Sequence, residues 1–140
     1  MIDVIPARPW MADKLHLQQP QVLFGQAMTR ESLEMACAGG MALAGVEGTR
    51  IVGMAGIFER WPGCGLAWAL LADDFANRRF SVFKLMQRAL DTTPYNRVEA
   101  YVAEEHAEGS RLLDHLGFAK EGTMRKFWQD RDYGLFAKVR

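Results

Sequence analysis

The order of strand and helix patterns after Gly65 constrains the fold of this chain more than any other feature. Residues Gly65–Leu71 form an almost continuous apolar run, which is typical of a strand buried on both faces at the centre of a sheet. A helix pattern over Ser81–Leu90 follows, and Val98–Val102 alternates as a strand does. A second helix is predicted over Ala107–Leu116. This β-α-β-α order predicts a sheet flanked by helices, with a ligand site in this part of the chain.

Strand pairs are predicted on both sides of this region. Residues 41–60 contain two apolar runs joined by Glu47-Gly48, where glycine supplies the positive φ of a hairpin turn. Residues 119–128 and 133–139 form a second predicted pair, separated by a polar turn. Ile2–Ile5 adds a short strand at the start.

Two helices are expected between the first strand and the hairpin. Pro9 is suited to the first turn of a helix that runs to about Leu17. Thr29 would cap a helix over Arg30–Ala38. The complete predicted order is β-α-α-β-β-β-α-β-α-β-β. It describes one α/β (α+β) domain over residues 1–140, with a mixed, mostly antiparallel central sheet.

Charge and composition exclude several classes of partner. Seventeen basic and seventeen acidic residues cancel, so no global field attracts nucleic acid or an anionic membrane, and neither is predicted as a partner. The chain starts without a signal-peptide pattern, and no apolar segment approaches the roughly 20 residues of a membrane helix. Cys37 and Cys64 form no CxxC pair, which favours two buried, reduced thiols. These features predict a cytoplasmic protein.

Motifs of other enzyme classes do not occur in the sequence. It contains no Gly-x-Ser-x-Gly elbow, no phosphate-binding Walker loop and no dinucleotide-binding glycine fingerprint. Its three histidines and two cysteines lack the spacing of metal ligands, so no metal is predicted.

One segment resembles a known family at the level of residues. From Val98 the chain reads VEAYVAEEHAEGSRLLDHLGFAKEG, a strand, polar loop and helix that end in Leu116-Gly117-Phe118. This block of about 25 residues resembles the GNAT superfamily of acyl-CoA-dependent N-acyltransferases, and the order of elements elsewhere is similar to that of the family. Gly117 has a physical reason in this pattern, because a helix end favours a residue that accepts the left-handed conformation.

The resemblance implies transfer of an acyl group from acetyl-CoA to an amine, by direct attack without a covalent enzyme intermediate. It implies that Leu66–Leu70 and Val98–Val102 are adjacent parallel strands that separate toward their carboxyl ends. The pantetheine arm would bind along the edge exposed there. Predicted cofactor contacts are Leu70, Leu71 and Ala72, and the backbone N–H of Leu71 or Ala72 would hold the oxyanion.

The loop before the predicted helix Ser81–Leu90 departs from the family pattern. Family members have a glycine-rich loop there, whose backbone N–H groups bind the pyrophosphate of coenzyme A. Residues 77–82 contain no glycine, so Arg78 and Arg79 would bind the pyrophosphate by charge, although Phe80 would crowd a close backbone approach. The alternative is that the arginines only begin a solvated helix. The other predicted cofactor contacts in this segment are Phe80, Ser81 and Val82.

The last helix departs from the family pattern as well. Family members often carry a tyrosine that protonates the leaving thiolate, and the corresponding position is Leu113, which cannot donate a proton. Tyr101 is the next candidate acid. His106 stands where an asparagine is usual, and it would hydrogen-bond the pantetheine arm. The alternative for His106 is a helix cap or a surface residue.

Acylation of an amine also requires a base. An alkylammonium group with a pKa of about 10.4 must lose its proton before it attacks a thioester. Glu59, at the end of the third predicted strand, is the candidate base, and Asp73, Asp74 and Glu104 are its rivals. The alternative for Glu59 is a surface charge at a strand end.

A second interpretation comes from a different class of function. The chain resembles, more loosely, the short GNAT-like proteins found among structural genes of short-tailed phages, which share the glycine-poor loop and the missing tyrosine. That resemblance implies a catalytically silent protein of particle assembly or host interaction, with a homodimer or another protein as partner. Four aromatic residues fit either a substrate cleft or core packing: Trp61, Trp68, Phe127 and Trp128.

Overall fold

The computed structural model describes residues 2–14, 34, 35, 37, 38, 40–72 and 79–140, with only the backbone at 40, 79, 81 and 82. The first predicted helix is a 3₁₀-helix, η1, over Pro9–Lys14, and its predicted continuation to Leu17 lies outside the described residues. The predicted helix Arg30–Ala38 also lies largely outside them.

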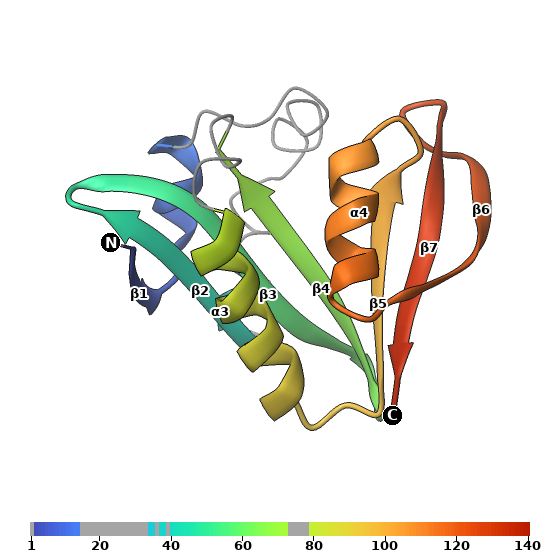
Figure 1. Cartoon of the computed structure of the whole chain (residues 1–140), viewed down its shortest axis with the longest axis horizontal. Coiled ribbons are helices and arrows are strands. Elements are labelled where there is room, and N and C mark those ends of the chain that lie inside the picture. The colour runs from blue at the N-terminus through green and yellow to red at the C-terminus, as the bar shows by residue number, and fades with distance from the viewer. Residues whose placement is uncertain (1, 15–33, 36, 39, 73–78) are drawn as a thin grey trace.

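A seven-stranded sheet forms the centre of the molecule, with strand order β1-β2-β3-β4-β5-β7-β6 (Figure 1). The predicted mixed, mostly antiparallel α+β architecture is therefore confirmed, and the apolar strand β4 lies in the middle of the sheet. The strands are β1 (Asp3–Pro6), β2 (Gly40–Glu47), β3 (Arg50–Trp61), β4 (Cys64–Leu71), β5 (Arg97–Ala103), β6 (Ala119–Trp128) and β7 (Arg131–Val139), and the helices are α3 (Arg79–Thr92) and α4 (Ala107–His115).

Strands β4 and β5 form a wedge. They pair in parallel, but only at Cys64–Leu66 with Arg97–Glu99, and the described neighbours elsewhere in the sheet are antiparallel. Beyond these three pairs the two strands diverge toward their carboxyl ends, as Figure 1 shows. This confirms the prediction of adjacent parallel strands that separate. The end where they pair is called the closed end below, and the other is called the open end.

Helices α3 and α4 cover one face of the sheet, whereas η1 packs on the other. Leu90 of α3 and Leu113 of α4 share a buried cluster with Ile57 of β3. Met11 of η1 packs in a separate cluster with Met54 of β3. Because side chains alternate along a strand, the residues of β3 divide between these two clusters. The face under α3 and α4 is called the helix face below.

The turn after α4 matches the sequence pattern. Gly117 has a φ of +91°, and its N–H donates to the Asp114 carbonyl at 3.1 Å. The Phe118 N–H donates to the Leu113 carbonyl at 3.0 Å, and the Phe118 ring is buried. The Leu-Gly-Phe tripeptide thus ends the helix and anchors the next strand in the core, as predicted.

The two cysteines differ in their surroundings. Cys64 is buried and Cys37 is half-buried, and both are free thiols. The prediction that both are buried is therefore wrong for Cys37, which lies at the margin of the cluster around Met11. None of the described helices is long and apolar enough to cross a membrane.

Candidate functional site

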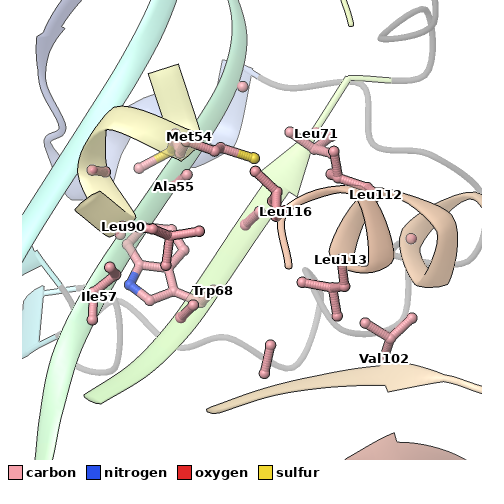
Figure 2. A pocket seen from close by; sticks show the side chains of 18 of the residues that line it. Met54, Ala55, Ile57, Trp68, Leu71, Leu90, Val102, Leu112, Leu113 and Leu116 are labelled. Atoms are coloured by element: carbon pink, nitrogen blue, oxygen red, sulfur yellow. The ribbon is translucent and has the colours of Figure 1, made fainter. Parts of the chain in front are cut away.

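A cavity of about 330 Å³ opens in the wedge between β4 and β5 and extends between α3 and α4 (Figure 2). Aliphatic and aromatic side chains form most of its wall. Among the described residues, no Asp, Glu, Lys or Arg lines it. Its polar side chains are Trp68, Tyr101, His106, Trp128 and Tyr133. An apolar pocket with a few polar groups is the usual form of a small-molecule site.

An aromatic wall borders the cavity on the side opposite the helix face. The rings of Tyr101 and Phe127 meet edge to face at 5.3 Å, and Phe127 and Tyr133 lie 5.6 Å apart. Trp128 contacts Tyr133 at 6.4 Å. The structure thus brings Phe127 and Trp128 of the four predicted aromatic residues to this wall, and Trp68 also lines the cavity.

Trp61, the fourth predicted aromatic residue, lies away from the cavity. Its side chain is 52% exposed near the turn between β3 and β4. The Arg60 guanidinium lies 4.7 Å from its ring centre, a cation–π contact. Trp61 therefore belongs neither to the core nor to the wall of the cavity.

Of the predicted cofactor contacts at the end of β4, some face the cavity and some do not. The Leu71 side chain lines the cavity, whereas the Leu70 side chain is fully buried and does not. The Ala72 N–H donates to the Val52 carbonyl at 3.0 Å, so it belongs to the ladder with β3. Because amides alternate along a strand, the Leu71 N–H is directed to the β5 side. The expectation that Ala72 offers its amide to an oxyanion is therefore wrong.

His106 caps α4 and lines the cavity. It is 8% exposed, and its Nδ1 accepts from the Gly109 N–H at 3.4 Å. A neutral imidazole with this acceptor carries its proton on Nε2. Burial lowers the pKa of His106, against a smaller opposite effect of Glu108. His106 is therefore the helix cap that the alternative interpretation predicted, and its ring also lines the cavity.

The neutral cap makes stability depend on pH. Because the folded-state pKa of His106 lies below its unfolded value of about 6.5, the unfolded chain binds the proton more tightly. We expect the free energy of unfolding to be highest above about pH 6.5 and to fall as pH decreases from there. Denaturant unfolding at a series of pH values measures this.

An asparagine at position 106 distinguishes the effect of helix capping from the effect of histidine protonation. His106→Asn keeps a good capping oxygen, so stability at about pH 8 should stay near that of the wild type while the acid-side loss shrinks. His106→Ala should cost about 1 kcal/mol at the same pH. The control is His115→Asn, at an exposed position of the same helix. An unchanged acid-side slope in His106→Asn would contradict this account.

Leu113 and Tyr101, the two predicted acid positions, lie on different faces of the sheet. Leu113 is buried in the cluster of the helix face and lines the cavity. The Tyr101 hydroxyl donates to Glu99 Oε1 at 3.2 Å. Tyr101 thus lines the cavity with its ring while its hydroxyl is engaged by a carboxylate.

Neither of the predicted bases that the structure describes lines the cavity. Glu59 is exposed and pairs with Gly65 at the closed end of the wedge, outside the lining. Glu104 is held by Lys120 Nζ at 2.7 Å and by the Thr123 hydroxyl at 3.1 Å, and the Lys120 hydrogen bond lowers its pKa. The rivals Asp73 and Asp74 lie outside the described residues.

The predicted pyrophosphate segment is described only in part. Helix α3 begins at Arg79, two residues before the predicted start. The Phe80 side chain is 78% exposed. Arg78 lies outside the described residues, and the side chains of Arg79, Ser81 and Val82 are not described.

An ion-pair cluster around the buried Glu99, near the closed end, was not predicted. Glu99 is 7% exposed and accepts from Arg60 at 3.0 Å and from Arg97 at 2.8 Å. Arg97 also bonds Glu121 at 2.7 Å. The available signal was the alternation of Arg97, Glu99 and Tyr101, which places all three on one face of β5. The cluster joins β3, β5 and β6 and does not line the cavity.

Comparison with known proteins gives a match in structure and none in sequence. No family profile and no curated protein sequence matches the chain. An N-acetyltransferase from Staphylococcus aureus Mu50 superposes with a TM-score of 0.78 at 10% identity, over 99% of this chain and 97% of that one. A GNAT-family acetyltransferase from Streptococcus pneumoniae gives 0.70 at 16% identity, over 99% of each chain.

A spermidine N-acetyltransferase chimera from Vibrio cholerae and hSSAT gives a TM-score of 0.74 at 14% identity, over 99% of this chain and 95% of that one. Such matches span nearly the whole of both chains, and each includes the central sheet. Together with the wedge between β4 and β5, they establish that the chain has the fold of the GNAT N-acetyltransferases.

Proposed function

We propose that the protein transfers an acyl group from acyl-CoA to an amine by direct attack on the thioester. The observation that carries this proposal is the apolar cavity at the point where β4 and β5 separate. An extended pantetheine arm can take the place of the missing strand partner there, since strand edges offer backbone groups to a ligand. The arrangement also excludes water from the reacting carbonyl, because apolar side chains surround it.

The chain itself would contribute orientation and electrostatic stabilisation. The Leu71 N–H, directed to the β5 side of β4, is the candidate donor to the developing oxyanion. The aromatic wall would hold the acceptor on the other side of the sheet. For the base, Glu59 stays a prediction, and its rivals Asp73 and Asp74 lie outside the described residues.

A calorimetric titration of the purified chain with coenzyme A tests the proposal. The expected result is saturable binding, followed by acyl transfer to an amine panel. Heat of dilution alone at millimolar coenzyme A would contradict the proposal. It would favour the second candidate, a catalytically silent GNAT-like protein with a structural or host-interaction role. Leu113 supports that candidate, because a leucine stands in the cavity wall where an acid is expected.

Leu113→Tyr tests the acid step. Leu113 borders empty space, so a tyrosine ring has room toward the cavity, and its hydroxyl would stabilise the leaving thiolate. We expect acyl transfer to stay unchanged or to rise by up to about tenfold. Leu113→Phe is the matched control without the hydroxyl. If the tyrosine variant folds but loses activity while the phenylalanine variant keeps it, the assignment of this position is wrong.

A further inference from the structure

The cavity continues on the helix face well beyond the open end of the wedge. Leu71 lines it near the open end, Ile57 and Leu90 line it nearer the closed end, and Leu116 lines it between them (Figure 2). Ala67, the partner of Ile57 in the β3–β4 ladder, lies four residues before Leu71. At 3.3 Å per residue this corresponds to a depth of about 13 Å. We call this part, between α3 and α4, the deep chamber.

Small residues create the space in the deep chamber. Ala55 pairs with Ala69 and Ile57 pairs with Ala67, so three alanines lie together on the helix face of β3 and β4. Ala100 of β5 adds a fourth on the other side of the wedge, and all four line the cavity. Protein interiors are normally packed as densely as organic crystals. The deep chamber is one part of the cavity of about 330 Å³, which also extends to the aromatic wall, and open space of this kind between two helices indicates a ligand more than a packing defect.

The chemistry of the chamber selects an aliphatic ligand. On the helix face, the described residues at the closed end offer no side-chain hydrogen bond. Trp68, whose buried Nε1 has no hydrogen-bond partner in the described part of the chain, alternates with Ala67 and Ala69 and packs with the cluster on the opposite face. The amides of a pantetheine arm, or an ammonium group, would lose their hydration there without compensation. A hydrocarbon chain loses nothing and gains the hydrophobic contribution of each buried methylene.

We propose that the deep chamber binds the acyl chain, and that the preferred donor is an acyl-CoA with a chain several carbons longer than acetyl. This inference rests on the proposed function. The hydrocarbon part of the acyl group would take no part in the reaction. The amine nitrogen bonds the carbonyl carbon, the carbon–sulfur bond breaks, and its electron pair leaves on sulfur. The proton lost by the amine ends on the thiolate or in solvent.

A chain-length series tests the inference. Binding of coenzyme A, acetyl-CoA, butyryl-CoA, hexanoyl-CoA and octanoyl-CoA is measured by calorimetry on the full chain. We expect the affinity to rise by roughly fourfold per methylene until the chamber is full. Hexanoyl-CoA should then bind on the order of a hundredfold tighter than acetyl-CoA. Equal affinities across the series would overturn the inference.

A cavity-filling variant tests where the acyl chain binds. Ala67→Leu places a larger side chain in the deep chamber, so the preferred acyl group should shorten while the affinity for free coenzyme A is kept. Because the new side chain fills space, the midpoint of thermal unfolding should not fall. Ala119→Leu, at an exposed position of β6, is the matched control and should leave the series unchanged. If Ala67→Leu leaves the preferred acyl length unchanged, the acyl chain binds elsewhere and the inference is overturned.

The two proposals fail in different ways. Saturable binding of free coenzyme A with a flat chain-length series would overturn the deep-chamber inference and leave the proposed function intact. Absence of binding by coenzyme A and by every acyl-CoA would overturn both. If Ala67→Leu does not fold, Ala89→Leu on α3, which also lines the cavity, provides the same measurement.

Discussion

Removal of both Arg78 and Arg79 should weaken coenzyme A binding by more than a hundredfold. A phosphate site without glycines must bind the pyrophosphate by side-chain charge, because backbone N–H groups cannot approach it as closely. Charge-assisted bonds to phosphate contribute about 1.5–3 kcal/mol each, and both would be lost in Arg78→Ala with Arg79→Ala. Calorimetric titration of the double variant measures the change.

Salt provides the control for this prediction. Partly exposed charges are screened over a Debye length of about 8 Å at physiological ionic strength. Wild-type affinity should therefore fall clearly as salt is raised, and the double variant should lose most of that dependence. Arg88→Ala on the exposed part of α3 is the matched charge removal away from the loop. Salt-insensitive binding that survives the double substitution would mean that backbone groups hold the cofactor.

Glu99→Ala should strongly destabilise the folded protein, although Glu99 lies outside the hydrophobic clusters of the described residues. The carboxylate is 9% exposed in its side chain, and it accepts from both Arg60 and Arg97. Its removal leaves two guanidinium groups without their shared partner. Since each arginine is still 32% exposed and keeps some hydration, we expect a loss of about 2–3 kcal/mol in the free energy of unfolding. Denaturant unfolding measures it.

Glu121→Ala is the matched comparison, because Glu121 bonds the same Arg97 from an exposed position. Its loss should be far smaller, as is usual for surface ion pairs. Glu99→Gln, which keeps the shape and one acceptor oxygen, should recover part of the stability. Equal losses for Glu99→Ala and Glu121→Ala would show that burial does not distinguish the two carboxylates.

The sequence predicts the sheet better than it predicts the site. The apolar run of β4, the alternation of β5 and Gly117 after α4 are local patterns, and each occurs in the structure where expected. The 3₁₀ character of η1 was not visible, because a short segment with Pro9 in its first turn fits either kind of helix.

Site residues depend on contacts that no local pattern contains. Whether Leu70 or Leu71 reaches the cavity depends on the phase of β4, and the Ala72 amide is engaged because of its register with β3. The burial of Glu99 depends on arginines from two strands, one of them 39 residues away in sequence. The cavity itself depends on how far α3 and α4 stand from four alanines, a distance that sequence spacing does not encode.

The narrow contact between β4 and β5 divides the sheet into two parts that share few backbone pairs. Strands β1–β4 and strands β5–β7 are two half-sheets, joined in the ladder by three residue pairs at the closed end. The Arg60–Glu99 bond crosses the same joint from β3 to β5 and acts as its brace. Ile57 of β3 and Val98 of β5 also share one buried hydrophobic cluster. The placement of one half against the other therefore depends mainly on side-chain packing and on the Arg60–Glu99 ion pair, and not on a continuous backbone ladder.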